Sequence, residues 1–293
     1  MLSFINRIKY VLDHPFNRDR KVRALINWMQ WQLKSRLMDK TYIHHFVNDT
    51  KVYAKRGQTG VTGNIYCGLH EWEDMCFTLH FLRANDVFVD IGANVGTYTI
   101  LASGVIGART FAFEPSPDAF LKLNKNFELN KISERITALN IGLSSSSGRM
   151  HFTTGLDTMN HIDLQKTQGS IEIEVDCLDN IVTESIALMK LDVEGHEFPV
   201  LLGAKKALSN KELHAMIIEW NVTEGGPSPD PAEYVSFVGG YGYMPVRYEP
   251  YTRTLSIIQS ETLNGNILFV KDLQFCQDRV RSAPLFSVQG KRI

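Results

Sequence analysis

Two places in the middle of the chain carry residue types that can hold a ligand. The first, Asp90-Ile-Gly-Ala-Asn-Val-Gly96, joins a carboxylate to two glycines that let a ligand approach the backbone. Its G-x-x-x-G spacing differs from the G-x-G-x-x-G of dinucleotide folds, and the charge of Asp90 disfavours a pyrophosphate. The second is Glu114, 24 residues after Asp90 and followed by Pro115. An acid there can accept hydrogen bonds from both hydroxyls of the ribose of an adenosine. The acidic loop at Asp90 in turn favours a cofactor with a cationic amino-acid end.

A second group of polar residues comes later in the chain. Lys190-Leu-Asp192-Val-Glu194-Gly-His196 and Glu219-Trp-Asn221 both lie at the ends of apolar stretches. In a strand, residues 190 and 192 share one face, as do residues 219 and 221, so Asp192 and Glu219 can converge on one site. A polar loop with Asn160 and His161 lies between Glu114 and Lys190 in the sequence. Loops of this length often contain residues that recognise a substrate.

The elements that must position these groups alternate between strand and helix. We expect core strands over 87–91, 109–114, 137–141, 187–192 and 216–220, short strands over 150–153 and 171–175, and closing strands near 244–248 and 267–270. We expect helices over 73–82, 96–103, 117–130, 198–208 and 231–238, and a loop over 57–63. Strands separated by helices indicate an α/β fold with a mainly parallel sheet, whose ligands lie beyond the carboxyl ends of the strands. Both polar groups lie at such ends.

The first part of the chain differs in charge from the rest. Residues 1–60 carry 12 Lys/Arg and 4 Asp/Glu, a net charge of +8, whereas the remaining 233 carry 19 and 28, a net charge of −9. Apolar residues at three- and four-residue spacing predict an amphipathic helix there: Val22, Leu25, Ile26, Met29, Leu33 and Leu37. We therefore divide the chain into a basic helical extension, residues 1–56, and a main domain, residues 57–293. Residues 1–45 have two interpretations: a helical cap packed on the main domain, or a basic helix that contacts an anionic membrane or lipid-linked substrate.

Composition excludes several classes of protein. The chain is 44 % apolar and 22 % charged, which is typical of a globular protein rather than a disordered or fibrous one. No apolar run approaches the ~20 residues that span a bilayer, and the first residues lack the apolar core of a signal peptide. Four widely spaced cysteines without a Cys-x-x-Cys pair indicate free thiols rather than a zinc site. We expect a soluble, cytoplasmic protein, and the acidic main domain disfavours a nucleic-acid partner.

Five motifs, in order, resemble those of the FkbM-type family of S-adenosylmethionine-dependent methyltransferases. They are VFVDIGANVGTYTILAS, FAFEPSPDAF, LNIGLSSSSG, LMKLDVEGHE and IIEWN. The resemblance implies a Rossmann-like class I sheet of seven strands, the last reversed, with helices on both faces. It also implies O-methylation of a hydroxyl, most often on a sugar, glycan or nucleotide-sugar or on a related small molecule.

The resemblance further implies which residues bind S-adenosylmethionine. Glu114 and Pro115 match the ribose-binding segment, and Glu73 matches an acid that faces the methionine end, with Glu71 as its alternative. The remaining matches fall in the cofactor loop (Asp90, Gly92, Asn94, Gly96, Thr97) and in a segment along the adenine (Asn140, Gly142).

The second polar group is then the acceptor site, because in-line methyl transfer must align the acceptor oxygen and remove its proton. Several roles stay open. A carboxylate, Asp192 or Glu219, can be the general base while Lys190 holds it ionised, or His196 can be the base. Alternatively Asp192, Glu194 and Glu219 can bind Mg²⁺, or the site can be purely positional. Asn160, His161, Glu194 and Asn221 are expected to contact the substrate.

Two other functions compete with sugar O-methylation. One is methylation of a nucleic acid, which the charge of −9 opposes. The other is a non-catalytic, cofactor-binding assembly subunit, against which the intact Asp90 and Glu114 argue. A homodimer is left open.

Overall fold

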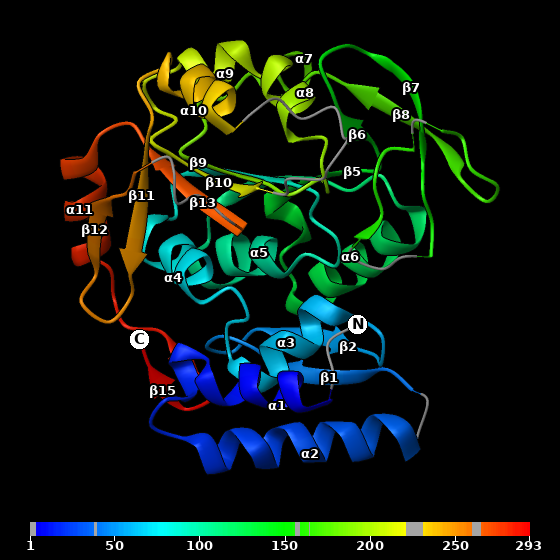
Figure 1. Cartoon of the computed structure of the whole chain (residues 1–293), viewed down its shortest axis with the longest axis vertical. Helices are drawn as coiled ribbons and strands as arrows, with labels where there is room; N and C mark the ends of the chain where they lie inside the picture. The colour runs from blue at the N-terminus through cyan, green and yellow to red at the C-terminus, as the bar shows by residue number, and fades with distance from the viewer. Residues whose placement is uncertain (1–3, 38–39, 156–158, 164, 221–230, 260–264) are drawn as a thin grey trace.

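An eight-stranded sheet forms the centre of the computed structural model, which describes residues 4–37, 40–155, 159–163, 165–220, 231–259 and 265–293 (Figure 1). Five parallel strands run in the order β10-β9-β3-β4-β5, and β13 lies antiparallel beside β10. These strands are β3 (Val87–Ile91), β4 (Arg109–Phe113), β5 (Ile136–Leu139), β9 (Leu188–Leu191), β10 (Ala215–Trp220) and β13 (Gly265–Val270). Beyond β13 lie β11 (Met244–Glu249) and the edge strand β12 (Thr254–Ile257). The expected class I sheet with its reversed last strand is confirmed, and β12 extends it by one strand.

Successive side chains of the buried strands point to opposite faces of the sheet and belong to two hydrophobic clusters, one on each face. In β3, Phe88 joins one cluster, while Val87, Val89 and Ile91 join the other. The first face is covered by α4 (Trp72–Phe81), α5 (Thr97–Thr99) with the π-helix Ile100–Ile106, α6 (Pro117–Asn130) and α11 (Leu273–Arg281). The second is covered by α7 (Leu178–Ile181), α8 (Glu197–Leu202), α9 (Lys205–Ser209) and α10 (Pro231–Gly239).

Two expected elements differ in the structure. The helix expected over 198–208 is broken between α8 and α9 at Gly203, since glycine disfavours a helix interior. A larger residue would not fit there, because a Cβ would lie 2.1 Å from the Ser144 carbonyl oxygen. The loop expected over 57–63 is instead the start of helix α3 (Thr59–Cys67). There Gly63 permits close packing, since a Cβ would lie 2.5 Å from the His70 ring.

A small second sheet projects from the carboxyl-end side of the large one. It consists of β6 (Gly142–Leu143), β8 (Ile171–Asp176) and β7 (Gly148–Phe152), in that order. Phe152 also forms an antiparallel β-bridge with Ile162, so the β7–β8 connection folds back against the end of β7. This sheet thus forms one wall beside the strand ends.

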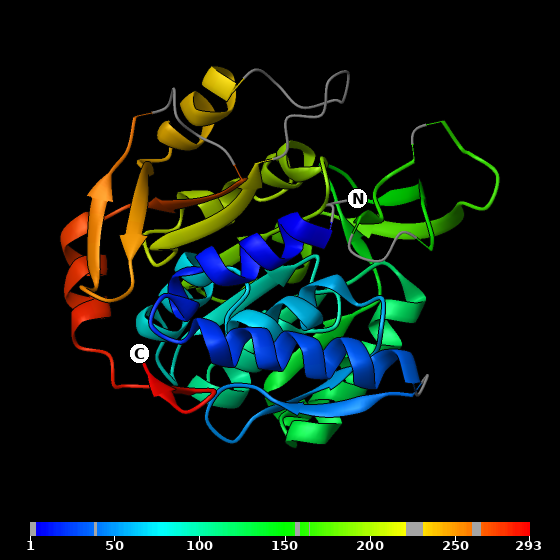
Figure 2. The same ribbon diagram turned by 60° about the horizontal axis from the view of Figure 1, so that its bottom comes forward.

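The N-terminal segment packs as a layer under the sheet's first face (Figures 1 and 2). It contains α1 (Phe4–Asp13), a 3-10 turn (Pro15–Asn17), α2 (Lys21–Leu37) and the hairpin β1 (Tyr42–His45) and β2 (Lys51–Ala54). Phe16, Trp31 and Val47 belong to the same hydrophobic cluster as the sheet. The C-terminal hairpin, β14 (Ser287–Val288) and β15 (Lys291–Arg292), joins it through a bridge between Val47 and Val288. The boundary at residue 56 stays a prediction, because this core is continuous across it.

Candidate active site

A cavity of about 260 Å³ lies at the carboxyl ends of β3, β4, β9 and β10. The sheet order reverses between β3 and β9, and ligands of open α/β sheets bind at such switch points. Both polar groups found in the sequence contribute to its wall, as do α3 and the β7–β8 connection. Six carboxyl-bearing residues line it: Glu71, Asp90, Glu114, Asp192, Glu194 and Glu219.

The loop after β3 is held in a tight turn that places it against the end of β9. Gly92 has φ +79°, and a Cβ there would lie 1.8 Å from the Asp192 carbonyl oxygen. Gly96 has φ +85° and packs on the Phe127 ring, so it shapes the turn without lining the cavity. Only glycine allows both the conformation and the approach, so the loop and the acceptor strand adjoin directly.

Asp90 and Glu114 are both buried at strand ends and both face the cavity. Asp90 accepts a hydrogen bond of 2.6 Å from the Thr99 hydroxyl, and burial raises its pKa to about 6 although nearby Lys190 opposes the shift. Glu114 accepts hydrogen bonds of 2.8 Å from the backbone N–H groups of Ser116 and Asn94. Burial raises the pKa of Glu114 to about 7 despite these donors. A ligand that donates to either carboxyl group would stabilise its charged form.

The predicted adenine segment lies next to Glu114. Gly142 lines the cavity, as do Thr97 and Pro115 from the two loops. Asn140 does not line it and instead donates to the carbonyl oxygens of Glu114 and Pro115, at 2.8 and 3.1 Å. Asn140 therefore positions the predicted ribose-binding segment.

Glu73 does not reach the cavity, whereas the alternative Glu71 does. Residues two apart on a helix point to different sides, so Glu73 is exposed and interacts with Arg247 and Glu249 of β11. Glu71 accepts a 3.0 Å hydrogen bond from the Asn266 amide. Glu73 thus lies away from the cavity, contrary to its predicted assignment, and Glu71 is the acid of this segment that lines it. A role of Glu71 at the methionine end stays a prediction.

Lys190, which is buried, and the half-buried Asp192 and Glu219 lie side by side at the ends of β9 and β10. The Lys190 ammonium lies 2.5 Å from an Asp192 carboxylate oxygen and 4.7 Å from the centre of the Tyr98 ring. Burial opposes the charge of Lys190, but Asp192, Glu71 and Asp90 outweigh it and raise the Lys190 pKa. For Asp192, burial likewise disfavours the charge, and Lys190 lowers the pKa below its usual range.

The pKa of Glu219 shifts in the opposite direction to that of Asp192. Burial, and then the negative charge of Asp192, raise the pKa of Glu219 well above its usual range. Glu219 is thus protonated at neutral pH and shares a hydrogen bond with ionised Asp192. The structure thus brings these two acids together as predicted, and their opposite pKa shifts favour one ionised and one protonated carboxyl group.

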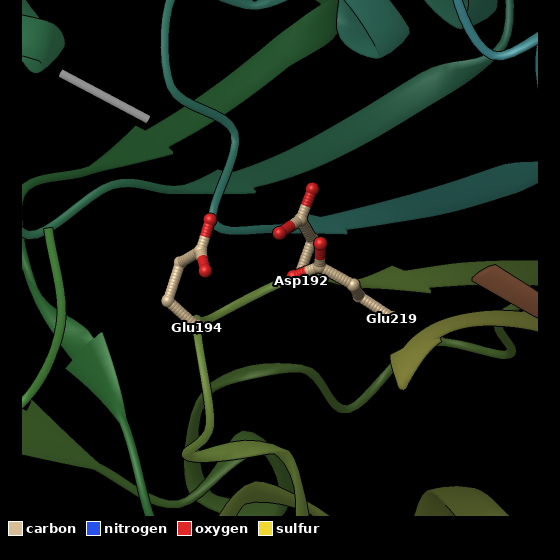
Figure 3. A group of neighbouring side chains, drawn as sticks. All are labelled: Asp192, Glu194 and Glu219. Atoms are coloured by element: carbon tan, nitrogen blue, oxygen red, sulfur yellow. The ribbon is translucent and has the colours of Figure 1, made fainter. Parts of the chain in front are cut away.

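Glu194 joins these two acids (Figure 3). Oxygen atoms of Asp192, Glu194 and Glu219 all lie within 4.8 Å of one another. Glu194 has φ +53°, and the Glu197 carboxylate supports its turn by accepting from the N–H groups of Val193 and Gly195. Three carboxyl groups at this spacing are the ligand type that Mg²⁺ prefers.

The remaining candidates divide between the cavity and its surroundings. His196 lines the cavity, is buried, and lies with Nε2 3.0 Å from the Ser144 hydroxyl; burial lowers its pKa to about 4. Asn160 also lines the cavity. His161 does not: its ring contacts the Met159 carbonyl oxygen in the exposed loop. Asn221 lies outside the described residues.

The sequence patterns did not single out two cavity residues, Tyr98, which is buried beside Lys190, and Val61 of α3. They also missed Ser144, which does not line the cavity but contacts His196. Tyr98 lies within the cofactor motif, so its spacing was available as a signal. Ser144 likewise lies within the motif LNIGLSSSSG, whereas no motif contains Val61, which only the fold brings to the cavity.

Comparison with known proteins places this geometry in a family. The model of the methyltransferase FkbM domain matches residues 90–245, more than half of the 293 residues. The hexuronic acid methyltransferase AglP of Haloferax volcanii is 35 % identical over 149 residues, which cover 48 % of this chain and 61 % of that protein. The match thus spans less than two thirds of that relative.

Two further proteins carry the family's name. The 31-O-demethyl-FK506 methyltransferase FkbM of Streptomyces tacrolimicus is 26 % identical over 207 residues, covering 58 % of this chain and 78 % of that protein. The crystal structure of methyltransferase FkbM from Methylobacillus flagellatus KT aligns with a TM-score of 0.46 and 17 % identity, over 85 % of this chain and 60 % of that one. The chain therefore belongs to the FkbM methyltransferase family, as its motifs predicted.

Proposed function

We propose that the protein transfers a methyl group from S-adenosylmethionine to a hydroxyl of a sugar, as part of a glycan or nucleotide-sugar. The observation that carries the proposal is the Lys190–Asp192–Glu219 chain in the same cavity as the Asp90–Gly96 loop. Hydroxyl groups need a base to accept their proton during methylation, and an ionised carboxylate is such a base. The sugar class rests on the similarity to the hexuronic acid methyltransferase.

The charges in the cavity fit this cofactor. Six carboxyl-bearing residues line the cavity, and the lysine there is already paired with Asp192. Such a wall suits a ligand with positive charges and no phosphate. Glu114 and the neighbouring Asn94 are the residues that would hold the ribose, and Glu71 and Asp90 those that would face the cationic end. When bound, S-adenosylmethionine supplies an electrophilic methyl group.

Asp192 is the group that we assign as the base. Lys190 keeps it ionised, and the protonated Glu219 donates a hydrogen bond that orients it. A carboxylate with a lowered pKa is a weak base toward a neutral hydroxyl. It suffices here because the acceptor oxygen becomes strongly acidic as it gains the methyl group, and its proton then passes to Asp192. His196 is a poorer candidate, since its Nε2 atom already contacts Ser144.

Labelled S-adenosylmethionine tests the proposal. Purified protein is incubated with a pool of nucleotide-sugars and hexuronic-acid oligosaccharides and, separately, with total RNA. We expect label in the sugar pool and none in RNA. Label in RNA, or no transfer by a protein that binds the cofactor in calorimetry, would overturn it.

The three-carboxyl cluster calls for one further measurement. If Asp192 acts as a base without a metal ion, activity should be unchanged when a chelator is added. Loss of activity on chelation, with recovery in Mg²⁺, would instead assign Asp192, Glu194 and Glu219 to a metal.

A further inference from the structure

Helix α2 is apolar on two opposite faces, and the body of the protein covers one of them. Ala24, Trp28 and Trp31 point inward and are buried. The outward residues are exposed by 42–73 %: Val22, Ile26, Met29, Leu33 and Leu37. The helical spacing in the sequence therefore identified mainly the outer face, not the packed one.

The outward residues form one continuous stripe. At roughly 3.6 residues per turn they fall within an arc of about 80° along the whole helix. Single exposed apolar residues are normal on a protein surface, but a contiguous stripe of them indicates a binding surface. Figures 1 and 2 show α2 on the outside of the N-terminal layer, and no described element lies over it.

The charges on α2 show what chemistry the stripe fits. Helix Lys21–Leu37 contains four basic residues and no acidic one. Lys21 and Arg36 lie on one side of the stripe and Arg23 and Lys34 on the other, and all four are exposed. A two-fold pairing of α2 with a second copy would bring like charges together, whereas an anionic surface complements them.

We propose that the outer face of α2 docks the protein on an anionic lipid membrane. The helix would lie in the plane of the interface, with its stripe among the acyl chains and its lysines and arginines at the headgroups. No helix in the described part of the chain combines the length and hydropathy needed to span a bilayer, so the contact is peripheral. This inference is independent of the acceptor assigned above.

Sedimentation with vesicles tests the proposal on the full chain. The two probes are vesicles of phosphatidylcholine alone and of phosphatidylcholine mixed with phosphatidylglycerol. We expect binding to the mixed vesicles only, weakened by salt. Met29→Ser with Leu33→Ser should reduce the binding constant roughly tenfold or more, and neutralising Lys21, Arg23 and Arg36 with glutamine by about fivefold per charge.

A matched variant controls for general changes in surface hydropathy. Leu121 and Leu285 are each 60 % exposed, close to the 62 % of Leu33, and lie outside the N-terminal segment. Leu121→Ser with Leu285→Ser should bind vesicles as the unaltered protein does. Thermal unfolding and binding of S-adenosylhomocysteine verify that every variant is folded.

Two results would overturn the proposal. One is equal vesicle binding by the stripe variant and the control variant. The other is a lack of vesicle binding by the unaltered protein together with a different molecular mass of the stripe variant in light scattering. That result would assign the stripe to contact between copies of the protein.

Discussion

Replacing Glu219 with glutamine should leave the acceptor site almost unchanged if Glu219 carries a proton. Burial and the charge of Asp192 keep Glu219 neutral, and a neutral glutamine has nearly the same shape and can still donate to the Asp192 carboxylate. Asp192→Asn, in contrast, removes the charge that Lys190 stabilises. Two conservative substitutions of neighbouring acids should therefore have very different effects.

The expected magnitudes follow from these interactions. Glu219→Gln should keep turnover within about threefold, because a hydrogen-bond donor remains. Glu219→Ala loses a hydrogen bond to a charged group, worth about 1.5–3 kcal/mol, or roughly 10- to 150-fold in rate. Asp192→Asn should cost ~10²–10⁴-fold, the usual contribution of a general base.

The pH dependence gives a second, independent measure. Since Lys190 lowers the pKa of Asp192, turnover should hold through neutral pH and fall only in acid, below the usual range of an aspartate. Glu219→Ala removes a donor to the charged form, so the acid limb should move to higher pH.

Single-turnover methyl transfer to the sugar acceptor measures the rates, and calorimetry with S-adenosylhomocysteine confirms an intact cofactor site. Infrared difference spectra need no acceptor: the unaltered protein should show a protonated carboxyl band at neutral pH that Glu219→Gln lacks. A loss of ~10²-fold or more in Glu219→Gln would refute the reasoning, because it would make the charge of Glu219 essential as base or metal ligand.

Three further predictions concern the cofactor site and the loop. Glu114→Ala should weaken binding of S-adenosylmethionine by ~1–3 kcal/mol, and in the unaltered protein, whose Glu114 has a pKa raised to about 7, affinity should fall as pH drops through that value; calorimetry across pH checks both. Gly92→Ala places a Cβ 1.8 Å from a carbonyl oxygen and should abolish cofactor binding and lower the melting temperature, whereas Gly148→Ala, with nothing within 4 Å, should do neither. His161→Ala should leave the Michaelis constant for the acceptor unchanged while Asn160→Ala raises it, since only Asn160 lines the cavity.

The core of the fold was predictable because its signals are local. Val87–Ile91 is a strand at the expected bounds, and the polar residues that follow such strands meet at one sheet edge by the geometry of parallel strands. The signals that failed depend on distant partners. Gly203, where the helix breaks, packs against the distant Ser144, and the choice between Glu71 and Glu73 depends on how α4 is rotated against β11.

The helix at 21–37 shows a different limit. Its periodicity correctly predicted a helix, but periodicity does not tell which of two apolar faces the protein covers. Trp28 packs inward with Val11 of α1 and Tyr66 of α3, and Trp31 packs against Tyr42 of β1. The aliphatic residues of the helix are left outside. His161 likewise gave no local sign that its ring turns away from the cavity.

The hairpin at 287–292 has a consequence for the order of folding. It is hydrogen-bonded to the N-terminal layer, which lies far away in the sequence. The Arg20 guanidinium donates to the Gln289 carbonyl oxygen, 269 residues away, and the Ser287 N–H donates to the Asn48 side-chain oxygen, 239 residues away. Contacts of such high sequence separation form late, because the loop must be closed before they stabilise anything. Residues 20–48, which are synthesised before the hairpin, therefore complete their packing only after it has been made. Until then the Phe16 ring lacks the cover of Lys291, and we expect a nascent chain to be more sensitive to proteases in that interval.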